Sequence, residues 1–352
     1  MKSTDESSSR YSPQGKRRIK LAYGSAGDQS KGLLRETWVT NSKTKMTLPK
    51  VLVLLAAFNG SKWIVEQIES ILNQAGVDLD LLVSDDGSSD DTLAKIARFA
   101  HDQRVRVISP PAPTGSAAQN FLWLIRNTSV DGYEFFAFAD QDDIWLPGKL
   151  RRGCSTLTTR SADGYSCAVT AFWSDGREKT LRQVNVVTAS DFMFEGAGQG
   201  CTFVLTATFY CRLRAFFLEH GTQTRSLHYH DWAIYALARS WKNEWSFDRR
   251  PMLRYRQHPG NDTGARLSLG GVTKRLRLIK GGWYLEQLRA IVQVCALAAP
   301  TDATIAEWNS LLNKPRSLTR RYRIARFFLK EGGRRRRSDN IILLGAAVLG
   351  WV

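Results

Sequence analysis

The stretch VLVLLAAFNGSKWIVEQIESIL, residues 51–72, decides the fold of this chain. It begins with a continuous apolar run, Val51–Ala56, which is typical of a parallel strand covered on both faces. Ser61 is suited to cap a helix directly after the polar turn. The apolar positions of that helix share one face: Ile64, Ile68, Ile71 and Leu72. The stretch therefore predicts a buried strand, a turn and an amphipathic helix.

The same alternation continues along the chain and indicates the fold class. We expect further strands at residues 80–83, 105–109, 135–139 and 201–206. We expect further helices at residues 92–100, 115–126, 231–239, 282–298 and 317–329. Strands that alternate with helices form a mostly parallel sheet with helices on both faces. The chain is therefore predicted to be an α/β protein with a C-terminal helical appendage, whose helix at 317–329 is capped by Ser317.

The formal net charge of +17 is concentrated at the two ends of the chain. Residues 1–50 carry a net +7 and residues 314–337 a net +10, whereas residues 51–313 carry only +1. Residues 1–46 show no sustained apolar periodicity, and we expect a disordered basic arm there. The nearly neutral body has no basic groove interleaved with aromatic residues, which argues against a nucleic-acid partner.

The basic C-terminal region indicates a different partner. Arg334–Arg337 precede the apolar run Ile341–Val352, whose 12 residues are too few to span a bilayer as one helix. Basic and apolar residues in this order fit peripheral contact of residues 314–352 with an anionic membrane. An ordinary surface helix with a frayed end is the alternative.

The cysteines and the N-terminal residues bear on the cellular compartment. Five cysteines, an odd number without CxxC spacing, argue against a disulfide framework or a zinc ribbon. No apolar segment follows the basic N-terminal residues, so we expect no secretory signal. The protein is therefore predicted to be cytoplasmic, with a position at the inner face of the cell membrane as a further hypothesis.

Three polar clusters follow expected strands: Phe58-Asn59-Gly60, Asp85-Asp86-Gly87 and Asp140-Gln141-Asp142-Asp143. Ligands of doubly wound sheets bind beyond the carboxyl ends of the strands. Carboxylates gathered there are unfavourable unless cations or hydrogen-bond donors compensate them. Mg²⁺ or Mn²⁺ prefers a few carboxylates together with phosphate oxygens. Although Asp-Asp-Gly-Ser alone is also a common turn and cap sequence, the clusters together predict a nucleoside diphosphate held by a metal ion.

These segments resemble glycosyltransferase family 2, and within it a bacterial rhamnosyltransferase-like subgroup with a D-Q-D-D-I-W or D-Q-D-D-V-W signature. The resemblance rests on residues 51–72, LLVSDDGSSDDTL at 81–93 and FFAFADQDDIWLPGKL at 135–150. Three later segments resemble the subgroup's motifs in the expected order: GQGCTFVL at 198–205, HYHDWAIYALA at 228–238 and LRYRQHPGND at 253–262. The resemblance covers about residues 48–265, so we expect a catalytic domain at 47–265 and a helical, basic region at 266–352.

The resemblance implies a fold and a reaction. The fold is GT-A, in which a Rossmann-like nucleotide half and an acceptor half share one sheet. The reaction is inverting transfer of a sugar from a nucleotide-diphosphate sugar to a hydroxyl of a polysaccharide or lipid-linked saccharide. dTDP-rhamnose follows from the subgroup, and UDP-hexoses are equally compatible with the motifs.

The resemblance also implies roles for the donor side. Nucleotide-sugar binding falls to Phe58, Asn59, Asp85, Asp86, Asp140 and Arg256. Metal binding falls to Asp142, with Asp140 and His258 as further ligands. The family's first motif more often reads T-Y-N-G, so Ala57 and Phe58 replace a hydroxyl residue and a tyrosine. Phe58 keeps the ability to stack on a base, but the hydroxyl bond is lost.

Inverting transfer also needs a base that removes the proton of the acceptor hydroxyl. Asp231 matches the position of the subgroup's catalytic aspartate, and it is also suited to be a helix N-cap. On the acceptor side we expect four residues: Trp145, Gln199, Gly200 and Trp232. Trp145 is expected either as a sugar-stacking platform or as a core aromatic, and His228 and His230 as lining or structural residues.

Two other classes compete with this interpretation. A nucleotidyltransferase-like enzyme on a similar sheet would use the metal-binding carboxylates differently. A non-enzymatic protein that binds anionic membranes or nucleic acid would depend on the basic ends alone. The acidic clusters at the strand ends favour the glycosyltransferase over both.

Overall fold

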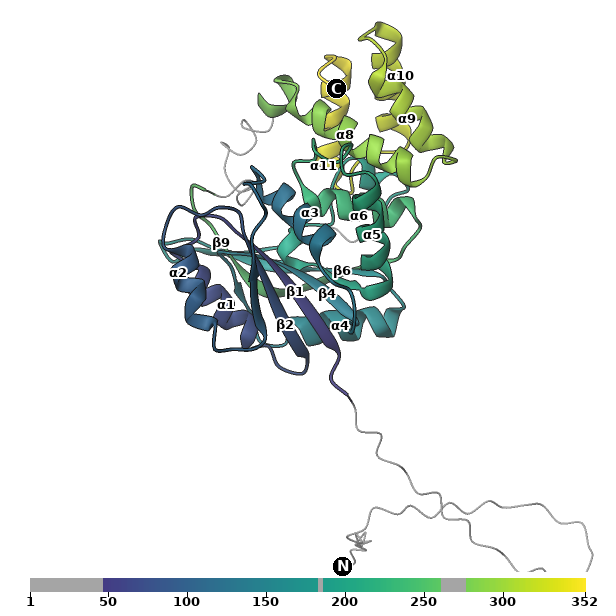
Figure 1. Cartoon of the computed structure of the whole chain (residues 1–352). Coiled ribbons are helices and arrows are strands. Elements are labelled where there is room, and N and C mark those ends of the chain that lie inside the picture. Colours follow the sequence, from purple (N-terminus) through teal and green to yellow (C-terminus); the bar gives the residue numbers. More distant parts are fainter. Residues whose placement is uncertain (1–46, 183–185, 261–276) are drawn as a thin grey trace, which may run out of the picture. The chain divides into compact units, whose positions relative to one another are not determined.

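The computed structural model describes residues 47–182, 186–260 and 277–352. The arm expected at residues 1–46 and the domain boundary expected at residue 265 lie outside these ranges. Residues Thr47–Val352 belong to one compact unit, shown in Figure 1. Among the described helices, none combines the length and the apolar character needed to cross a membrane.

Four parallel strands form the nucleotide-binding type of half-sheet that the sequence predicts. They are β1 (Lys50–Ala57), β2 (Asp78–Asp85), β3 (Val105–Ile108) and β4 (Phe135–Asp140), in the spatial order β3-β2-β1-β4. The sheet continues from β4 through β8, β6 and β9 to β5, and β7 pairs with β6. These five strands are β5 (Ile144–Trp145), β6 (Gly164–Phe172), β7 (Glu178–Leu181), β8 (Val204–Thr206) and β9 (Trp245–Arg256). β8 runs antiparallel to β4 and β6, whereas β6 and β9 are parallel, so the sheet is mixed.

Helices cover both faces of this sheet (Figure 1). They are α1 (Ile64–Leu72), α2 (Thr92–Ile96), α3 (Ala117–Asn127), α4 (Lys149–Arg160), α5 (Ala207–Glu219) and α6 (His230–Ser240). Alternate residues of β1 enter different cores, as the period of two along a strand requires. Val53 packs in the cluster that contains α1 and α4, whereas Leu54 packs in the cluster that contains α3, α5 and α6. The continuous apolar run in the sequence therefore reflects burial on both sides.

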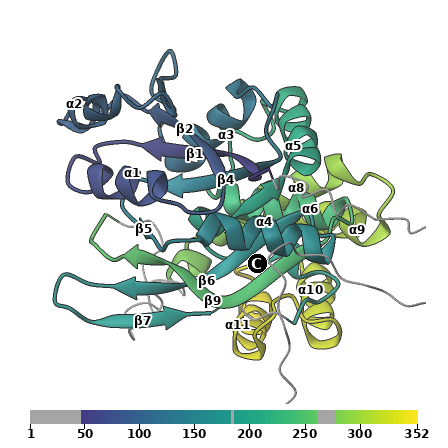
Figure 2. The same cartoon turned by 90° about the horizontal axis from the view of Figure 1, so that it is seen from below.

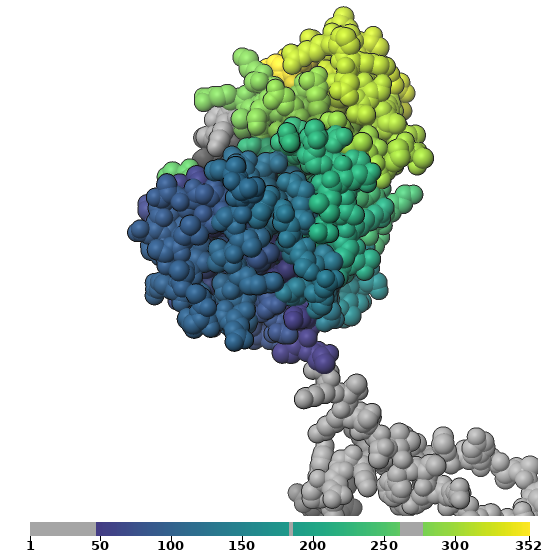
Figure 3. Space-filling model, viewed as in Figure 1, coloured from purple at the N-terminus to yellow at the C-terminus, as the bar shows by residue number. Residues whose placement is uncertain are grey.

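The helices that lie wholly within the described residues 277–352 are α8 (Trp283–Ala298), α9 (Ala303–Asn313), α10 (Leu318–Lys330) and α11 (Arg337–Val348). Their apolar side chains join the same core as α3, α5 and α6, with Leu288, Trp308 and Phe328 as examples. The space-filling view shows them packed directly on the sheet-bearing part (Figure 3). Ser317 caps α10 as predicted, since its side chain accepts a bond from the Arg320 N–H over 3.1 Å.

Two predicted caps are wrong. α1 begins at Ile64 and not after Ser61, because the Gly60 carbonyl accepts the N–H groups of Trp63 and Ile64 in a preceding turn. α6 begins at His230, so Asp231 lies inside the first turn and is not the N-cap. The strand expected at 201–206 is also shorter, because Gly200–Thr202 form a 3₁₀ turn before β8.

The sequence pattern did not predict several elements of the structure: β6, β7, β9, α4, α5, α9 and α11. β9 illustrates the reason, because its sequence WSFDRRPMLRYR is interrupted by charged residues and by Pro251. The register between β6 and β9 shifts near Pro251, where the strand bulges. Such an edge-like strand has neither clean alternation nor a continuous apolar run.

A buried ionic network joins the C-terminal region to the body. The Asp191 carboxylate, which has no exposed surface, accepts bonds from Arg335 Nη1 over 2.6 Å, Tyr235 Oη over 2.8 Å and Arg239 Nη1 over 3.0 Å. Arg335 Nη2 also donates to the Gly196 carbonyl over 2.6 Å. Arg335 belongs to the basic cluster that the sequence assigned to a membrane-facing tail, and it is instead a core residue.

Replacing Asp191 by Ala would leave Arg335 buried without its closest carboxylate. We expect Asp191→Ala to lower the free energy of unfolding by about 3–5 kcal/mol, the usual effect of breaking a buried ion pair. Urea unfolding followed by circular dichroism measures this. The matched control is Asp175→Ala, whose ion pair with Arg177 is 52% and 72% exposed and should contribute far less, because water screens it. Equal, small effects of the two substitutions would contradict the assignment.

Candidate active site

The carboxyl ends of three parallel strands meet at one edge of the sheet. β1 pairs in register with β2 as far as Asp85 and with β4 as far as Asp140, so the segments that follow these strands lie side by side. Gln141 joins two of them, because it accepts the Phe58 N–H over 2.8 Å and donates from Nε2 to the Phe58 carbonyl over 2.9 Å. The Phe58 ring is 53% exposed on this edge. The three polar clusters that follow β1, β2 and β4 therefore lie together at this edge of the sheet.

Hydrogen bonds of the acidic side chains fix the loop after β2. The buried Asp85 carboxylate accepts the Ser88 N–H over 3.0 Å and the Ser88 hydroxyl over 2.6 Å. The buried Asp86 carboxylate accepts the Thr114 N–H over 2.6 Å and its hydroxyl over 2.8 Å. The Asn59 N–H donates to the Ser88 hydroxyl over 2.9 Å, which ties the loop after β1 to the loop after β2. Both carboxylates are thus compensated by donors of the chain itself.

The end of β9 supplies a histidine to the same edge. His258 Nε2 lies 2.8 Å from Asp142 Oδ2, although 116 positions separate the two residues. The imidazole stacks on the Trp63 ring with 4.2 Å between the centroids. Arg256 Nε donates to the Asp142 carbonyl over 2.9 Å, and its guanidinium forms an ion pair with Glu66. Asp142, Arg256 and His258, all predicted as site residues, are therefore brought together.

A buried acidic residue lies directly behind Asp142. Asp143 has no exposed surface, and its Oδ1 accepts the Arg256 N–H over 3.1 Å. Its Oδ2 has no hydrogen-bond partner among the described residues. Burial, and then the negative charges of Asp142 and Asp140, raise the pKa of Asp143 well above its usual range. Asp140, Asp143 and Cys201 each offer a ligand atom, and these atoms lie within 4.8 Å of one another.

Two tryptophans expected on the acceptor side are core residues. Trp145 is 2% exposed, and the buried Lys149 Nζ lies 3.5 Å from its ring centroid. Burial lowers the pKa of Lys149 to about 8. Trp232 is 6% exposed and donates from Nε1 to the Phe192 carbonyl over 2.9 Å. The burial of both rings favours the core alternative for Trp145 and argues against stacking of Trp232 on an acceptor sugar.

The other two acceptor-side residues lie beside Asp231. A Cβ added to Gly200 would come within 2.4 Å of His230 Nε2 and 3.2 Å of the Asp231 Cβ, so Gly200 allows the start of α6 to approach closely. Gln199, which is partly exposed, directly precedes it. Asp231 is also partly exposed, and its Oδ1 accepts the Trp232 N–H over 2.7 Å. Since Cys201 follows Gly200 and lies beside Asp140 and Asp143, the Asp231 group and the Asp142 group are neighbours.

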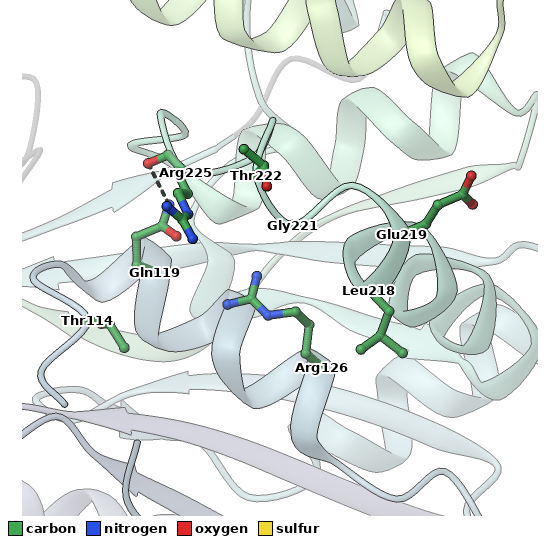
Figure 4. Close-up of a pocket in the computed structure, with 8 residues that line it drawn as sticks. All are labelled: Thr114, Gln119, Arg126, Leu218, Glu219, Gly221, Thr222 and Arg225. Atoms are coloured by element: carbon green, nitrogen blue, oxygen red, sulfur yellow. Dashed lines mark hydrogen bonds between the residues drawn. The ribbon is translucent and has the colours of Figure 1, made fainter. Parts of the chain in front are cut away.

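A cavity of about 630 Å³ lies beside this edge, and no sequence motif indicated it. It lies between α3 and residues 218–225, and Thr114, the partner of Asp86, is part of its lining (Figure 4). Arg126 and Arg225 also line it, and Gln119 Nε2 donates to the Arg225 carbonyl over 3.2 Å. Burial and the neighbouring Arg225 charge lower the pKa of Arg126. The charged residues that line the cavity are therefore Arg126, Arg225 and Glu219.

The fold and this edge define a class of protein. A mostly parallel α/β sheet with aspartates at its carboxyl edge and a C-terminal helical region is a GT-A arrangement. Residues 52–221 match the model of the family described as Glycosyl transferase family 2. The dTDP-rhamnosyl transferase RfbG of Shigella flexneri is 33% identical over 244 residues, which cover 69% of this chain and 84% of that protein. The chain belongs to glycosyltransferase family 2, the nucleotide-sugar-dependent enzymes that the motifs indicated.

Two further comparisons extend this result. An Escherichia coli protein named UDP-Glc:alpha-D-GlcNAc-diphosphoundecaprenol beta-1,3-glucosyltransferase WfgD is 33% identical over 109 residues, 30% of this chain and 40% of that protein. The crystal structure of S. aureus TarS 1-349 in complex with UDP-GlcNAc has a TM-score of 0.52 at 16% identity, and covers 86% of this chain and 82% of that chain. The latter shows the shared fold.

Because His230 is buried, the free energy of unfolding is expected to depend on pH. Its ring stacks on Phe121 with 4.0 Å between the centroids, and burial lowers its pKa from 6.5 to about 3. The unfolded state binds this proton below pH 6.5 while the folded state does not, so stability falls as the pH decreases from 6.5 towards 3. Between pH 7.5 and pH 5 we expect His230 to account for a loss of about 2 kcal/mol. Urea unfolding at the two pH values measures it.

His230→Leu removes the titrating group and keeps the site apolar. The variant should lose about 2 kcal/mol less than the wild type between the two pH values. His101→Leu is the matched control, because His101 is exposed and its replacement should leave the pH dependence unchanged. Identical pH dependence of the wild type and His230→Leu would contradict a neutral, buried His230.

Proposed function

We propose that the chain is a metal-dependent, inverting glycosyltransferase that transfers a sugar from dTDP-rhamnose or a UDP-hexose to a hydroxyl of a saccharide or lipid-linked saccharide. The observation that carries the proposal is the closeness of two groups at one sheet edge: the Asp142–His258 pair and the Asp231–Gly200 contact. The name of the Shigella flexneri relative supports dTDP-rhamnose. The name of the Escherichia coli relative supports a UDP-hexose and a lipid-linked acceptor.

The donor nucleotide would bind over the loops after β1 and β2. The exposed Phe58 ring offers a face on which the base can stack. Asp85 and Asp86 hold their loop in place and keep acceptor capacity for base N–H or ribose hydroxyl groups, since a carboxylate has about four lone-pair sites. Asn59 keeps the two loops together through Ser88. These residues would fix the position of the diphosphate next to Asp140 and Asp142.

The side chains of Asp142, Asp140 and His258 are suited to bind a divalent metal ion. Carboxylate oxygens are donors that Mn²⁺ and Mg²⁺ prefer, and the buried Asp143 Oδ2, which has no hydrogen-bond partner among the described residues, supports a need for compensation at this group. Asp142, Asp140 and His258 would hold the ion, and Arg256 would keep Asp142 in position through its carbonyl. The bound ion would stabilise the negative charge of the departing nucleoside diphosphate. Cys201 would contribute little to such a site, because thiolates suit softer metals than Mn²⁺ or Mg²⁺.

Asp231 would act as the general base. It is partly exposed and ionisable, and its Oδ1 accepts the Trp232 N–H, which holds the carboxylate in position. The acceptor hydroxyl gives its proton to Asp231 while its oxygen attacks the anomeric carbon from the face opposite the diphosphate. The bond to the diphosphate breaks, and the configuration at that carbon inverts. His230 is excluded from this role because it is buried.

A donor screen tests the proposal. Purified protein is incubated with Mn²⁺ or Mg²⁺, a panel of nucleotide sugars and saccharide acceptors, and the released nucleoside diphosphate is measured. We expect metal-dependent release from dTDP-rhamnose or a UDP-hexose. Release of pyrophosphate from a nucleoside triphosphate and a sugar 1-phosphate would instead identify the nucleotidyltransferase alternative.

Substitutions at Asp142 and Asp231 should separate binding from transfer. Asp142→Ala should abolish metal-dependent binding of the nucleoside diphosphate in calorimetric titration. Asp231→Asn should keep that binding but lower the transfer rate by about 100-fold or more, because the base is lost. Asp131→Asn, an exposed carboxylate at the amino end of β4, is the matched control and should change neither. Unaltered nucleotide binding in Asp142→Ala, or a normal rate in Asp231→Asn, would refute the respective role.

A further inference from the structure

The outer surface of α10 and α11 carries large apolar side chains in water. Its members are Leu318 (81% exposed), Tyr322 (64%), Leu329 (69%), Ile341 (69%) and Val348 (60%), which we call the α10–α11 face. Soluble proteins scatter single apolar side chains over their surfaces, whereas a contiguous patch marks an interaction site. We propose that the α10–α11 face docks on an anionic lipid bilayer, a role that does not depend on the proposed reaction.

The five side chains form one surface because of their spacing. In α10, Leu318, Tyr322 and Leu329 are separated by four and seven positions and share a stripe, as do Ile341 and Val348 in α11. Each stripe lies opposite the residues that its helix buries in the common core, such as Ile324 in α10 and Leu343 in α11. Both stripes therefore face away from the same core.

Hydrogen bonds at both ends hold the two helices in an antiparallel pair. Arg320 Nη1, at the start of α10, donates to the Val352 carbonyl just after α11 over 3.5 Å. The N–H groups of Gly333 and Arg334, just after α10, donate to Asn340 Oδ1 in the first turn of α11 over 2.8 and 2.6 Å. Figure 2 shows the two helices side by side, on the side of the unit farthest from α2. The end of α10 and the start of α11 therefore lie together, which places Leu329 and Ile341 at the same end of the pair.

Exposed basic side chains surround the apolar stripes. They are Lys314, Arg316, Arg323, Arg326, Lys330, Arg336 and Arg337. Within the described part of the chain, Arg323 alone among them has an ion pair, which it forms with the exposed Glu307. Residues 314–337 contain one acidic residue, Glu331. The face therefore combines apolar insertion with a local excess of positive charge.

The basic residues that do not contribute are equally informative. Arg335 binds Asp191 in the core, and Arg334 donates from Nε to the Phe194 carbonyl over 3.0 Å. Arg320 donates from Nε to the Leu311 carbonyl over 2.9 Å and is 2% exposed. The sequence grouped Arg334–Arg337 as one lipid-facing cluster, but the structure divides it. The buried side chains of Arg320, Arg334 and Arg335 attach α10 and α11 to the rest of the unit. The exposed arginines give the outer surface of the two helices its positive charge.

The positive charge of the α10–α11 face favours an anionic bilayer over a second copy of the chain. A second copy of the chain would bring two positive surfaces together, which is unfavourable, whereas anionic headgroups attract basic side chains by about 1 kcal/mol each. α10 has 13 residues and α11 has 12, while a spanning helix needs about 20. The hairpin would therefore lie in the plane of the interface, with its apolar stripes below the headgroups.

Co-sedimentation of the full chain with lipid vesicles tests the proposal. We expect binding to vesicles of phosphatidylglycerol and phosphatidylethanolamine, weaker binding at 1 M salt, where the Debye length falls to about 3 Å, and no binding to phosphatidylcholine vesicles. The double variants Leu329→Glu/Ile341→Glu and Arg326→Glu/Lys330→Glu should each bind at least tenfold more weakly. All four side chains are exposed, so circular dichroism should show an unchanged fold.

Matched controls change the same kinds of residue elsewhere. Leu93→Glu on α2 (44% exposed) and Arg177→Glu should bind like the wild type. Unchanged binding of the two double variants would overturn the proposal, and so would equal losses in the controls, which would indicate unspecific charge attraction. A lipid-free dimer that the Leu329→Glu/Ile341→Glu variant abolishes, in sedimentation velocity, together with no vesicle binding, would assign the face to a second copy.

Discussion

The proposed active site depends on one constraint: the carboxylates gathered at one edge of the sheet must be compensated by hydrogen-bond donors or cations. A parallel sheet directs the ends of β1, β2 and β4 to the same place, and each end carries carboxylates. Asp85 and Asp86 are compensated by N–H and hydroxyl groups of their own loops. Asp142 meets His258 and Asp143 meets the backbone of Arg256, but the pKa of Asp143 stays raised. In the proposed site a bound cation would offset the negative charges of Asp140 and Asp142 and would in turn hold the diphosphate.

The same requirement explains how the C-terminal region is attached. Asp191 is buried in the body, and its charge is balanced by Arg239 from α6 and by Arg335 from the segment before α11. The net charge of +17 therefore has two different parts. Some arginines of the C-terminal region neutralise buried acids, while others remain outside on α10 and its neighbours. The amino-acid composition alone does not show which arginines are buried and which are exposed.

The sequence predicted the first half of the sheet and the meeting of the acidic clusters, because parallel strands read as continuous apolar runs and end in polar turns. It did not predict β9, whose charges and Pro251 hide its strand character. It also could not distinguish an exposed tryptophan from a buried one. Trp145 and Trp232 lie next to functional motifs in sequence, yet both pack in the core. Local patterns reveal which residues are near a site along the chain, whereas exposure depends on distant elements.

The most direct test of the proposed donor site is crystallographic. A crystal of the protein soaked with Mn²⁺ and a nucleoside diphosphate would show the metal in an anomalous difference map. We expect one peak bound to Asp142 Oδ2 and His258 Nε2, with the diphosphate beside it and the base against Phe58. A nucleotide at another edge of the sheet, or a metal peak away from Asp142, would contradict the site on which the proposed reaction depends.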